Sequence, residues 1–180
     1  MTMHSRWNEE VAKQFAGDLA QRVYSSRLLG QDTTLVLHGG GNTSVKTQVA
    51  NLFGEQEDIL YVKGSGWDLE TIEAEGFAPC RMKDLLRLAE LETLSDPQMT
   101  VELQKSKIDP SAPAPSVEAI LHAILPAKFV DHTHADAVLT VTNTADGRQR
   151  VSEIYGDRVV VVPYVMPGFK LPRLGAVLFP

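Results

Sequence analysis

Residues 129–136 constrain the fold of this chain most, because a short apolar strand there ends in two histidines. His132 and His134 are two positions apart, so an extended backbone points both imidazoles toward the same side. Sites in α/β proteins usually lie at the carboxyl ends of strands, and imidazole is the commonest nitrogen ligand of zinc. The spacing is compatible with a metal site, in which Asp131 and Asp136 could hold the far ring nitrogens. It is also compatible with two surface or core histidines, which is the commoner case for an isolated pair.

Composition narrows the class of protein. The chain has 180 residues, which is typical of one domain with a core of its own. Its net charge of −6 argues against a nucleic-acid binder or a protein of anionic membrane surfaces, but leaves a small phosphorylated ligand open. Cys80 is the single cysteine, which excludes an intrachain disulfide and fits a reducing compartment. No apolar run has the length of a signal-peptide core or a membrane span, so we expect a cytoplasmic protein.

Hydrophobic periodicity and turn residues predict an α/β chain whose helices and strands are mixed rather than strictly alternating. The helices are expected over residues 9–29, with Gly30 as C-cap, over 82–94, 98–105 and 116–125, and for about two turns from Asp136. The strands are expected over residues 35–38, 43–47, 59–63 and 129–132, and last over 159–162.

Two glycine-containing turns could bind an anion. Residues 38–44 contain three consecutive glycines followed by Asn42, and glycines let backbone N–H groups approach an anion closely. Residues 63–66 could add the Ser65 hydroxyl and the backbone at Gly66. Neither segment is a Walker loop or a dinucleotide fingerprint. Each is also compatible with an ordinary turn at the end of a strand.

Ser116 and Glu118 form a third polar cluster. Ser116 is a good N-cap residue, which would place Glu118 in the first turn of a helix, where the helix dipole alone favours a carboxylate. The functional alternative makes Ser116 part of an anion site and Glu118 an acid/base group near the metal. His122 lies four residues later on the same helix face, and we interpret it as a packed or solvated histidine rather than a ligand.

Taken together and in order, these clusters resemble the class II aldolase/adducin family. The resemblance covers most of the chain and is carried by residues 41–45, 63–66, 115–118, 132–135 and 163–168. The sequences of these motifs are most similar to the aldolase half of larger proteins that fuse this domain to a short-chain dehydrogenase. It implies a three-layer α/β/α sandwich around a central, mostly antiparallel sheet. It also implies a homo-oligomer, usually a tetramer, with sites at subunit borders.

The resemblance also implies a role for each cluster. His132 and His134 would be ligands of a divalent metal ion, most commonly zinc, and Glu118 would be the base that exchanges a proton with the carbon next to a carbonyl. The expected reaction is retro-aldol cleavage of a sugar phosphate or related ketose through an enediolate that the metal stabilises. A Schiff-base lysine is then unnecessary. The residues expected to hold the substrate phosphate are Asn42, Ser65, Gly66 and Ser116.

The chain departs from the family pattern at two points. Val117 stands where the aldolases have a second serine, which favours a different or an unphosphorylated substrate. The family's third histidine ligand would follow the region of Phe169, and no histidine follows His134 in this chain. A catalytic zinc normally has three protein ligands. We therefore interpret residues 1–180 as a single domain that lacks its C-terminal part.

Two alternatives to an aldolase remain. One is a non-catalytic domain of the same fold, used for assembly or interaction as in the adducin head. The other keeps the metal site but catalyses epimerisation or dehydration, since one fold hosts several chemistries. The presence of the histidine pair and of Glu118 favours catalysis for the parent protein.

Overall fold

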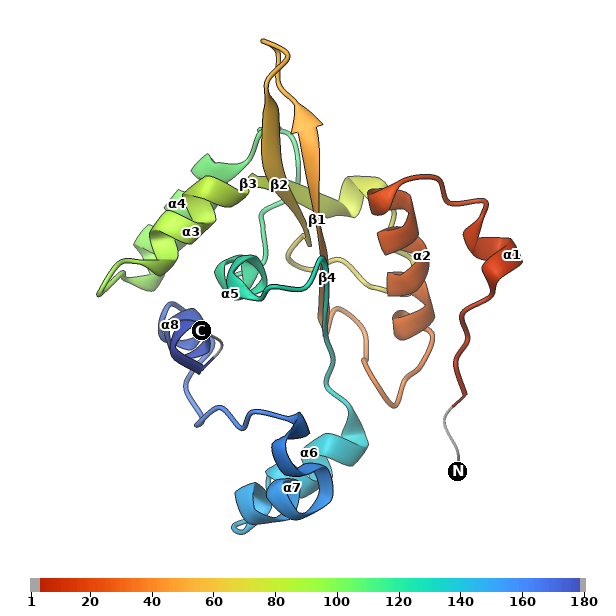
Figure 1. The fold of residues 1–180 in the computed structure, drawn as a ribbon, viewed down its shortest axis with the longest axis vertical. Helices are drawn as coiled ribbons and strands as arrows, with labels where there is room; N and C mark the ends of the chain where they lie inside the picture. The colour runs from red at the N-terminus through yellow and green to blue at the C-terminus, as the bar shows by residue number, and fades with distance from the viewer. Residues whose placement is uncertain (1–3, 179–180) are drawn as a thin grey trace.

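A four-stranded antiparallel sheet forms the centre of the computed structural model, which describes residues 4–178 (Figure 1). The strand order is β3-β2-β1-β4. The strands are β1 (Asn42–Ala50), β2 (Gln56–Lys63), β3 (Phe77–Arg81) and β4 (Phe129–His132). The predictions of β1, β2 and β4 are confirmed. β3 was missed because Pro79 and Cys80 break its alternation, and Pro79 is tolerated because β3 is an edge strand.

Helices cover both faces of the sheet, which confirms the predicted three-layer α/β/α architecture (Figure 1). One face carries α2 (Asp18–Gly30), whose Val23 packs with Leu69 and Phe77. The other face carries the helices of the larger core, where Leu60 and Val62 of β2 are buried. These helices are α3 (Met82–Ala89), α4 (Asp96–Ser106), α5 (Ala119–Ile124) and α8 (Lys170–Leu178).

Three further α-helices lie outside these layers. They are α1 (Glu9–Ala12), α6 (Asp136–Thr142) and α7 (Gly147–Tyr155), and two short 3₁₀ turns cover Ala74–Gly76 and Gly156–Arg158. α6 and α7 lie side by side beyond the end of β4 (Figure 1). The two-turn helix expected from Asp136 is confirmed, whereas α7 and α8 were not predicted.

The single helix predicted over residues 9–29 is wrong. The structure has two helices, separated at Gly17, whose φ of 86° lies in the left-handed region that a right-handed helix does not use. The side chain of Asn8 caps α1 by accepting from Glu10 and Val11. Gly30 is the last residue of α2 rather than its cap.

Two predicted strands are also wrong. Residues 35–38 form turns and irregular chain rather than a strand, and the carbonyl of Asp32 accepts from the N–H groups of Leu35 and Val36. Residues 159–162 have no regular structure, and no strand of the described sheet lies beside them. Val159 and Val160 are exposed there. α3 ends at Ala89, five residues before the predicted end.

The β1–β2 hairpin extends beyond the rest of the sheet. β4 pairs with β1 only over residues 42–45, and β3 pairs with β2 only over residues 59–63. Residues 47–58, called the ribbon below, therefore project as two strands on their own (Figure 1, top). Among the described residues, none of the helices has both the length and the apolar character needed to cross a membrane.

Candidate active site

The two predicted ligand histidines converge at the end of β4. His132 is the last residue of the strand, and His134 is held just beyond it because its backbone N–H donates to Leu35 O at 2.8 Å. The ring centroids of His132 and His134 are 4.8 Å apart. The segment of residues 35–38 thus acts as the support of His134, although it is not a strand.

Glu118 lies next to this pair. β1 places Asn42 opposite His132. Glu118, the N-cap residue of α5, lies between them. Glu118 Oε2 is 2.9 Å from His132 Nδ1 and 3.3 Å from Asn42 Nδ2. The side chains of His132 and Glu118 are 34% and 18% exposed, so both are accessible to a small ligand yet partly shielded from water.

These contacts keep Glu118 ionised. Burial favours the neutral carboxyl, but the hydrogen bond and charge of His132, with the amide of Asn42, outweigh it, so the pKa of Glu118 is lowered. Glu118 is therefore suited to accept a proton at neutral pH. Asn42 is nearly fully buried, and its Oδ1 has no hydrogen-bond partner among the described residues.

Gly40 and Gly41 pack against the histidines, which explains why these two positions lack side chains. A Cβ added to Gly40 would lie 3.1 Å from His134 Nδ1. At Gly41 an added Cβ would lie 2.9 Å from His132 O, and its φ of 72° already favours glycine. The run is thus a close-fitting wall of the site.

The turn at residues 63–66 contacts both the glycine run and the segment that contains Ser116. Lys63 Nζ donates to Gly39 O at 3.1 Å, and burial lowers the pKa of Lys63. Gly64 forms an isolated antiparallel bridge with Pro115, and Ser116 N donates to Lys63 O at 3.3 Å. The predicted anion-binding turns are therefore neighbours in space.

The environment of Ser116 differs from the prediction. α5 begins at Ala119 with Glu118 as N-cap, so Ser116 lies before the helix and not at its cap. Ser116 Oγ accepts from the backbone N–H of Glu118 at 3.2 Å and thereby fixes the residue that carries the carboxylate. Ser65 and Gly66 are exposed, and the backbone N–H of Ser65 donates to Ala114 O, which leaves its hydroxyl for a ligand.

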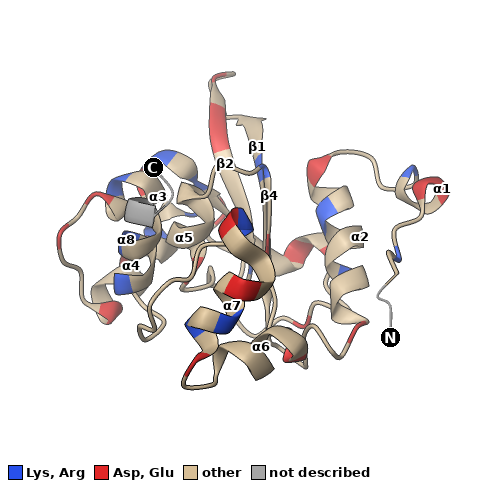
Figure 2. Ribbon diagram, turned by 60° about the horizontal axis from the view of Figure 1, so that its bottom comes forward, with Lys and Arg blue, Asp and Glu red and all other residues tan. Residues whose placement is uncertain are grey.

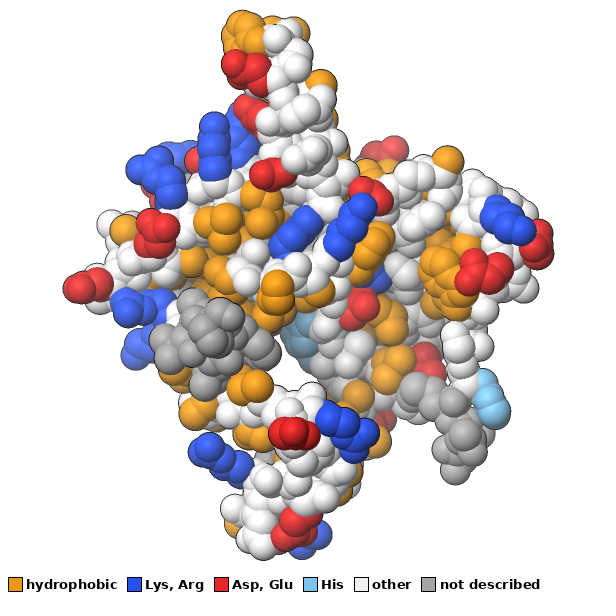
Figure 3. All heavy atoms as spheres, in the orientation of Figure 1, with side chains coloured by type: hydrophobic (Ala, Val, Ile, Leu, Met, Phe, Trp, Pro, Cys, Tyr) orange, Lys and Arg blue, Asp and Glu red, His pale blue; other side chains and the backbone are white. Residues whose placement is uncertain are grey.

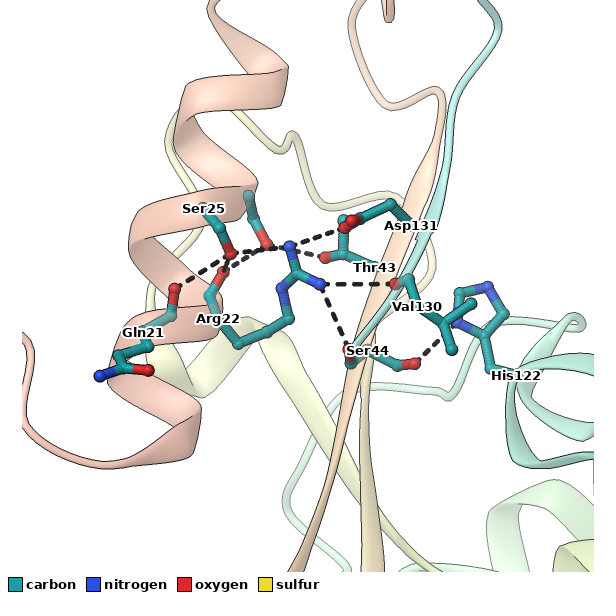
Figure 4. A network of polar contacts seen from close by, with 9 residues as sticks. Gln21, Arg22, Ser25, Thr43, Ser44, His122, Val130 and Asp131 are labelled. Atoms are coloured by element: carbon teal, nitrogen blue, oxygen red, sulfur yellow. Dashed lines mark hydrogen bonds and ion pairs between the residues drawn. The ribbon is translucent and has the colours of Figure 1, made fainter. Parts of the chain in front are cut away.

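Asp131 does not orient a histidine. Its carboxylate pairs at 2.7 Å with Arg22 of α2, on the opposite face of the sheet (Figure 4). Arg22 is 1% exposed and also donates to the backbone carbonyl of Ser44. Sequence reasoning missed Arg22, because its partners Asp131 and Ser44 lie far away in the sequence. The carboxylate that does contact His132 is Glu118.

His122 is packed, as predicted. Its Nδ1 lies 2.8 Å from Ser44 Oγ, and burial lowers the pKa of His122 to about 4 (Figure 4). It is therefore neutral and inaccessible to a substrate at neutral pH. Cys80 is likewise buried, and desolvation raises the pKa of its thiol to about 11, which makes it unreactive.

The donor set fits a divalent metal in part. Two imidazoles and an adjoining carboxylate are the ligand types that zinc takes. Within residues 4–178, however, no three histidine, cysteine, aspartate or glutamate side chains form a group that could hold a metal. His132 and His134 would therefore be two nitrogen ligands of an incomplete set.

Comparison with known proteins decides the family. The family described as Class II Aldolase and Adducin N-terminal domain matches residues 20–177. The chain belongs to the class II aldolase/adducin family. The same family was expected from the four polar clusters of the sequence.

Two relatives of this aldolase/adducin domain differ in length from it. The structure of the N-terminal class II aldolase domain of a conserved Thermoplasma acidophilum protein is 46% identical, with a TM-score of 0.90, over 99% of this chain and 82% of that one. The "Uncharacterized oxidoreductase YuxG" of Bacillus subtilis (strain 168) is 41% identical over 168 residues. That match spans 93% of this chain but 24% of the relative.

Proposed function

We propose that this domain catalyses metal-dependent aldol cleavage of a sugar phosphate or related ketose. The observation that carries the proposal is the contact of Glu118 Oε2 with His132 Nδ1 at 2.9 Å, beside His134. A divalent metal bound by the two histidines, most simply zinc, would polarise the carbonyl of the substrate. Membership of the class II aldolase/adducin family supports the same reaction class.

In this proposal Glu118 moves the proton. Its ionised carboxylate accepts a proton from the carbon next to the carbonyl in the direction of synthesis, and returns it to that carbon after cleavage. Asn42 donates to the carboxylate and so holds it in place. The partial burial of Glu118 excludes water that would compete for the proton.

We propose that the substrate phosphate binds at Ser65, Gly66, Ser116 and Asn42. The two turns that carry the first three are joined by the bridge between Gly64 and Pro115, which supports a single anion site. Asn42 donates one N–H of its Nδ2 to Glu118, and its second N–H is the donor that it would offer to the phosphate. Val117 is 44% exposed beside Ser116, which supports a substrate with an apolar or unphosphorylated portion there.

The wider setting is also a proposal. Because the Bacillus subtilis relative is named an oxidoreductase and is about four times as long as the match, we propose that the domain serves a cytoplasmic protein with a separate redox domain. We further propose a homo-oligomer, as the family resemblance implies. Epimerisation or dehydration at the same site is the catalytic alternative. The contact of Glu118 with the histidine pair disfavours a purely structural, adducin-like role.

Glu118→Gln tests the proposed base. We expect the variant to keep its metal but to lose exchange of the substrate proton next to the carbonyl, followed by nuclear magnetic resonance in heavy water. Glu102→Gln, at a partly exposed position on α4, is the matched control and should exchange as the wild type does. Undiminished exchange in Glu118→Gln would refute the assignment of the base. Loss of metal would make Glu118 a ligand instead.

A screen of ketose phosphates and free ketoses tests the reaction. We expect release of a triose or triose phosphate, measured by a coupled assay, and no release by Glu118→Gln. Formation of an isomer without any triose would contradict aldol cleavage and favour epimerisation.

A further inference from the structure

One lysine is buried beside the proposed site. Lys63, the last residue of β2, is 4% exposed, whereas every other lysine within residues 4–178 is exposed or half-buried. Figure 2 shows most of the charged positions on the helices and on the ribbon. A buried ammonium group loses its hydration, which is costly unless an anion or several acceptors replace the water. The burial of Lys63 therefore requires a compensating partner.

The other buried cation of the described chain has such a partner. Arg22 pairs with the carboxylate of Asp131 at 2.7 Å. Lys63 forms no ion pair within residues 4–178, and its Nζ donates to Gly39 O at 3.1 Å. Because an ammonium group has three N–H donors, two donors of Lys63 are left without an acceptor among the described residues.

Nearby carboxylates compensate the charge of Lys63 only in part. Burial lowers the pKa of Lys63, and the charges of Asp68 and Glu118 act against this effect without cancelling it. Both carboxylates are engaged elsewhere, since Asp68 accepts from the backbone N–H of Glu70 and Glu118 contacts His132. The ammonium group of Lys63 can therefore accommodate a further anion.

Lys63 lies where the two glycine-containing turns meet. It holds the carbonyl of Gly39, and a Cβ added to Gly39 would lie 3.7 Å from Gly66 O. Its own carbonyl accepts from the backbone N–H of Ser116 at 3.3 Å. Ser65 and Gly66 follow Lys63 directly in the chain and are exposed. The unpaired charge thus lies among the residues of the proposed phosphate site.

We propose that Lys63 binds the phosphate of the substrate, so that the site selects a phosphorylated ketose over a neutral one. A phosphate group has three acceptor oxygens, which suit the two free donors of Lys63 and the hydroxyl of Ser65 better than the two oxygens of a carboxylate. Figure 3 shows histidine atoms at the inner edge of a hollow between α5 and the pair α6 and α7, where a small ligand has access. This inference rests on the proposed function and reduces its two substrate classes to one.

Lys63→Met tests the contact without any turnover. Isothermal titration with inorganic phosphate should show binding to the wild type, and the dissociation constant should rise by at least about tenfold in the variant. Lys83→Met, at an exposed position of α3, is the matched control and should bind phosphate as the wild type does. An unchanged dissociation constant in Lys63→Met would overturn the proposal, and so would a wild type that binds acetate as tightly as phosphate.

Stability measurements separate this role from a structural one. Because an unpaired buried ammonium group is costly, the midpoint of urea unfolding should be unchanged or higher in Lys63→Met. A lower midpoint, together with undiminished phosphate binding, would make Lys63 a structural support of Gly39 and overturn the proposal. The wild type alone provides a further test, since phosphate should raise its melting temperature more than sodium chloride of equal ionic strength. Equal effects of the two salts would also count against an anion site.

Substrate preference separates this inference from the aldol reaction itself. In the screen described above, the wild type should cleave ketose phosphates with a lower KM than free ketoses. Phosphate binding that depends on Lys63, without any aldol cleavage, would contradict the proposed function and support the role of Lys63. A wild type that cleaves free ketoses as readily as ketose phosphates would overturn the role of Lys63 and support the aldol reaction.

Discussion

At the residue scale, the polar groups nearest the proposed site are held in one protonation state by their partners. Glu118 is ionised because His132 and Asn42 outweigh the effect of burial. His122, one helical turn further along α5, is neutral because burial lowers its pKa to about 4. The proposed base therefore has a neutral imidazole, not a cation, behind it at neutral pH.

The burial of His122 predicts a loss of stability in acid. Its pKa falls from 6.5 to about 4 on folding, so below pH 6.5 the unfolded chain binds a proton that the folded chain excludes. The free energy of unfolding should fall by about 2 to 3 kcal/mol between pH 7 and 4.5. Urea unfolding of the wild type and of His122→Asn measures it, with exposed His4→Asn as control. An equal pH dependence in wild type and His122→Asn would contradict this cause.

The glycine wall predicts a difference between two neighbouring positions. An alanine at Gly40 would press on His134 Nδ1 and Leu37 O, whereas an alanine at Gly39 would make only ordinary contact, its nearest neighbour being Gly66 O at 3.7 Å. Gly40→Ala should therefore lower the affinity for a divalent metal several-fold, and Gly39→Ala should not. Isothermal titration with Zn²⁺ compares them, and equal affinities would argue against this packing.

At the element scale, the sequence predicted what depends on local pattern. β1, β2 and β4 follow from alternation, whereas the helix predicted from residue 98 missed the capping box of Ser95 with Gln98, at which α4 begins. β3 and the break at Gly17 were missed, because an edge strand with a proline and a helix with one permissive glycine give no clear period. Residues 159–162 have the composition of a strand, but their pairing partner decides that structure, and composition does not reveal the partner.

The last residue of α2, Gly30, also depends on contacts with residues far away in the sequence. An alanine at Gly30 would overlap the backbone of Leu69 and Glu70, so the close packing of this helix requires glycine. Gly30→Ala should cost about 2 to 3 kcal/mol of unfolding free energy. Gly17→Ala has open space and only backbone strain, and should cost about 1 kcal/mol. Urea unfolding compares the two, and equal costs would contradict the packing argument.

At the scale of the whole molecule, Arg22 joins the layers behind the proposed site (Figure 4). From α2 it contacts Asp131 of β4 and the carbonyl of Ser44 on β1, whose hydroxyl meets His122 of α5. The partners of Arg22 lie up to 109 positions away in sequence, so no local pattern identifies them. The histidine pair could be predicted, but not this support.

The buried contacts of Arg22 predict a large loss of stability when its guanidinium is removed. Arg22→Met leaves Asp131 without its cation and removes one donor each from the carbonyls of Ser44 and Val130, and should lower the free energy of unfolding by about 3 kcal/mol. Arg150→Met, which breaks an exposed pair with Asp146, should cause no measurable change. Equal stabilities of the two variants in urea would contradict the role of Arg22.

The metal content of the purified protein is the decisive test of the proposed metal site. The purified 180-residue protein should contain close to one divalent ion per chain by elemental analysis. The ion should be largely lost in His134→Ala and retained in His4→Ala. Such a result would support a metal held at the end of β4 by the histidine pair. An absence of metal from the wild type, or an undiminished content in His134→Ala, would contradict metal-dependent chemistry at this site.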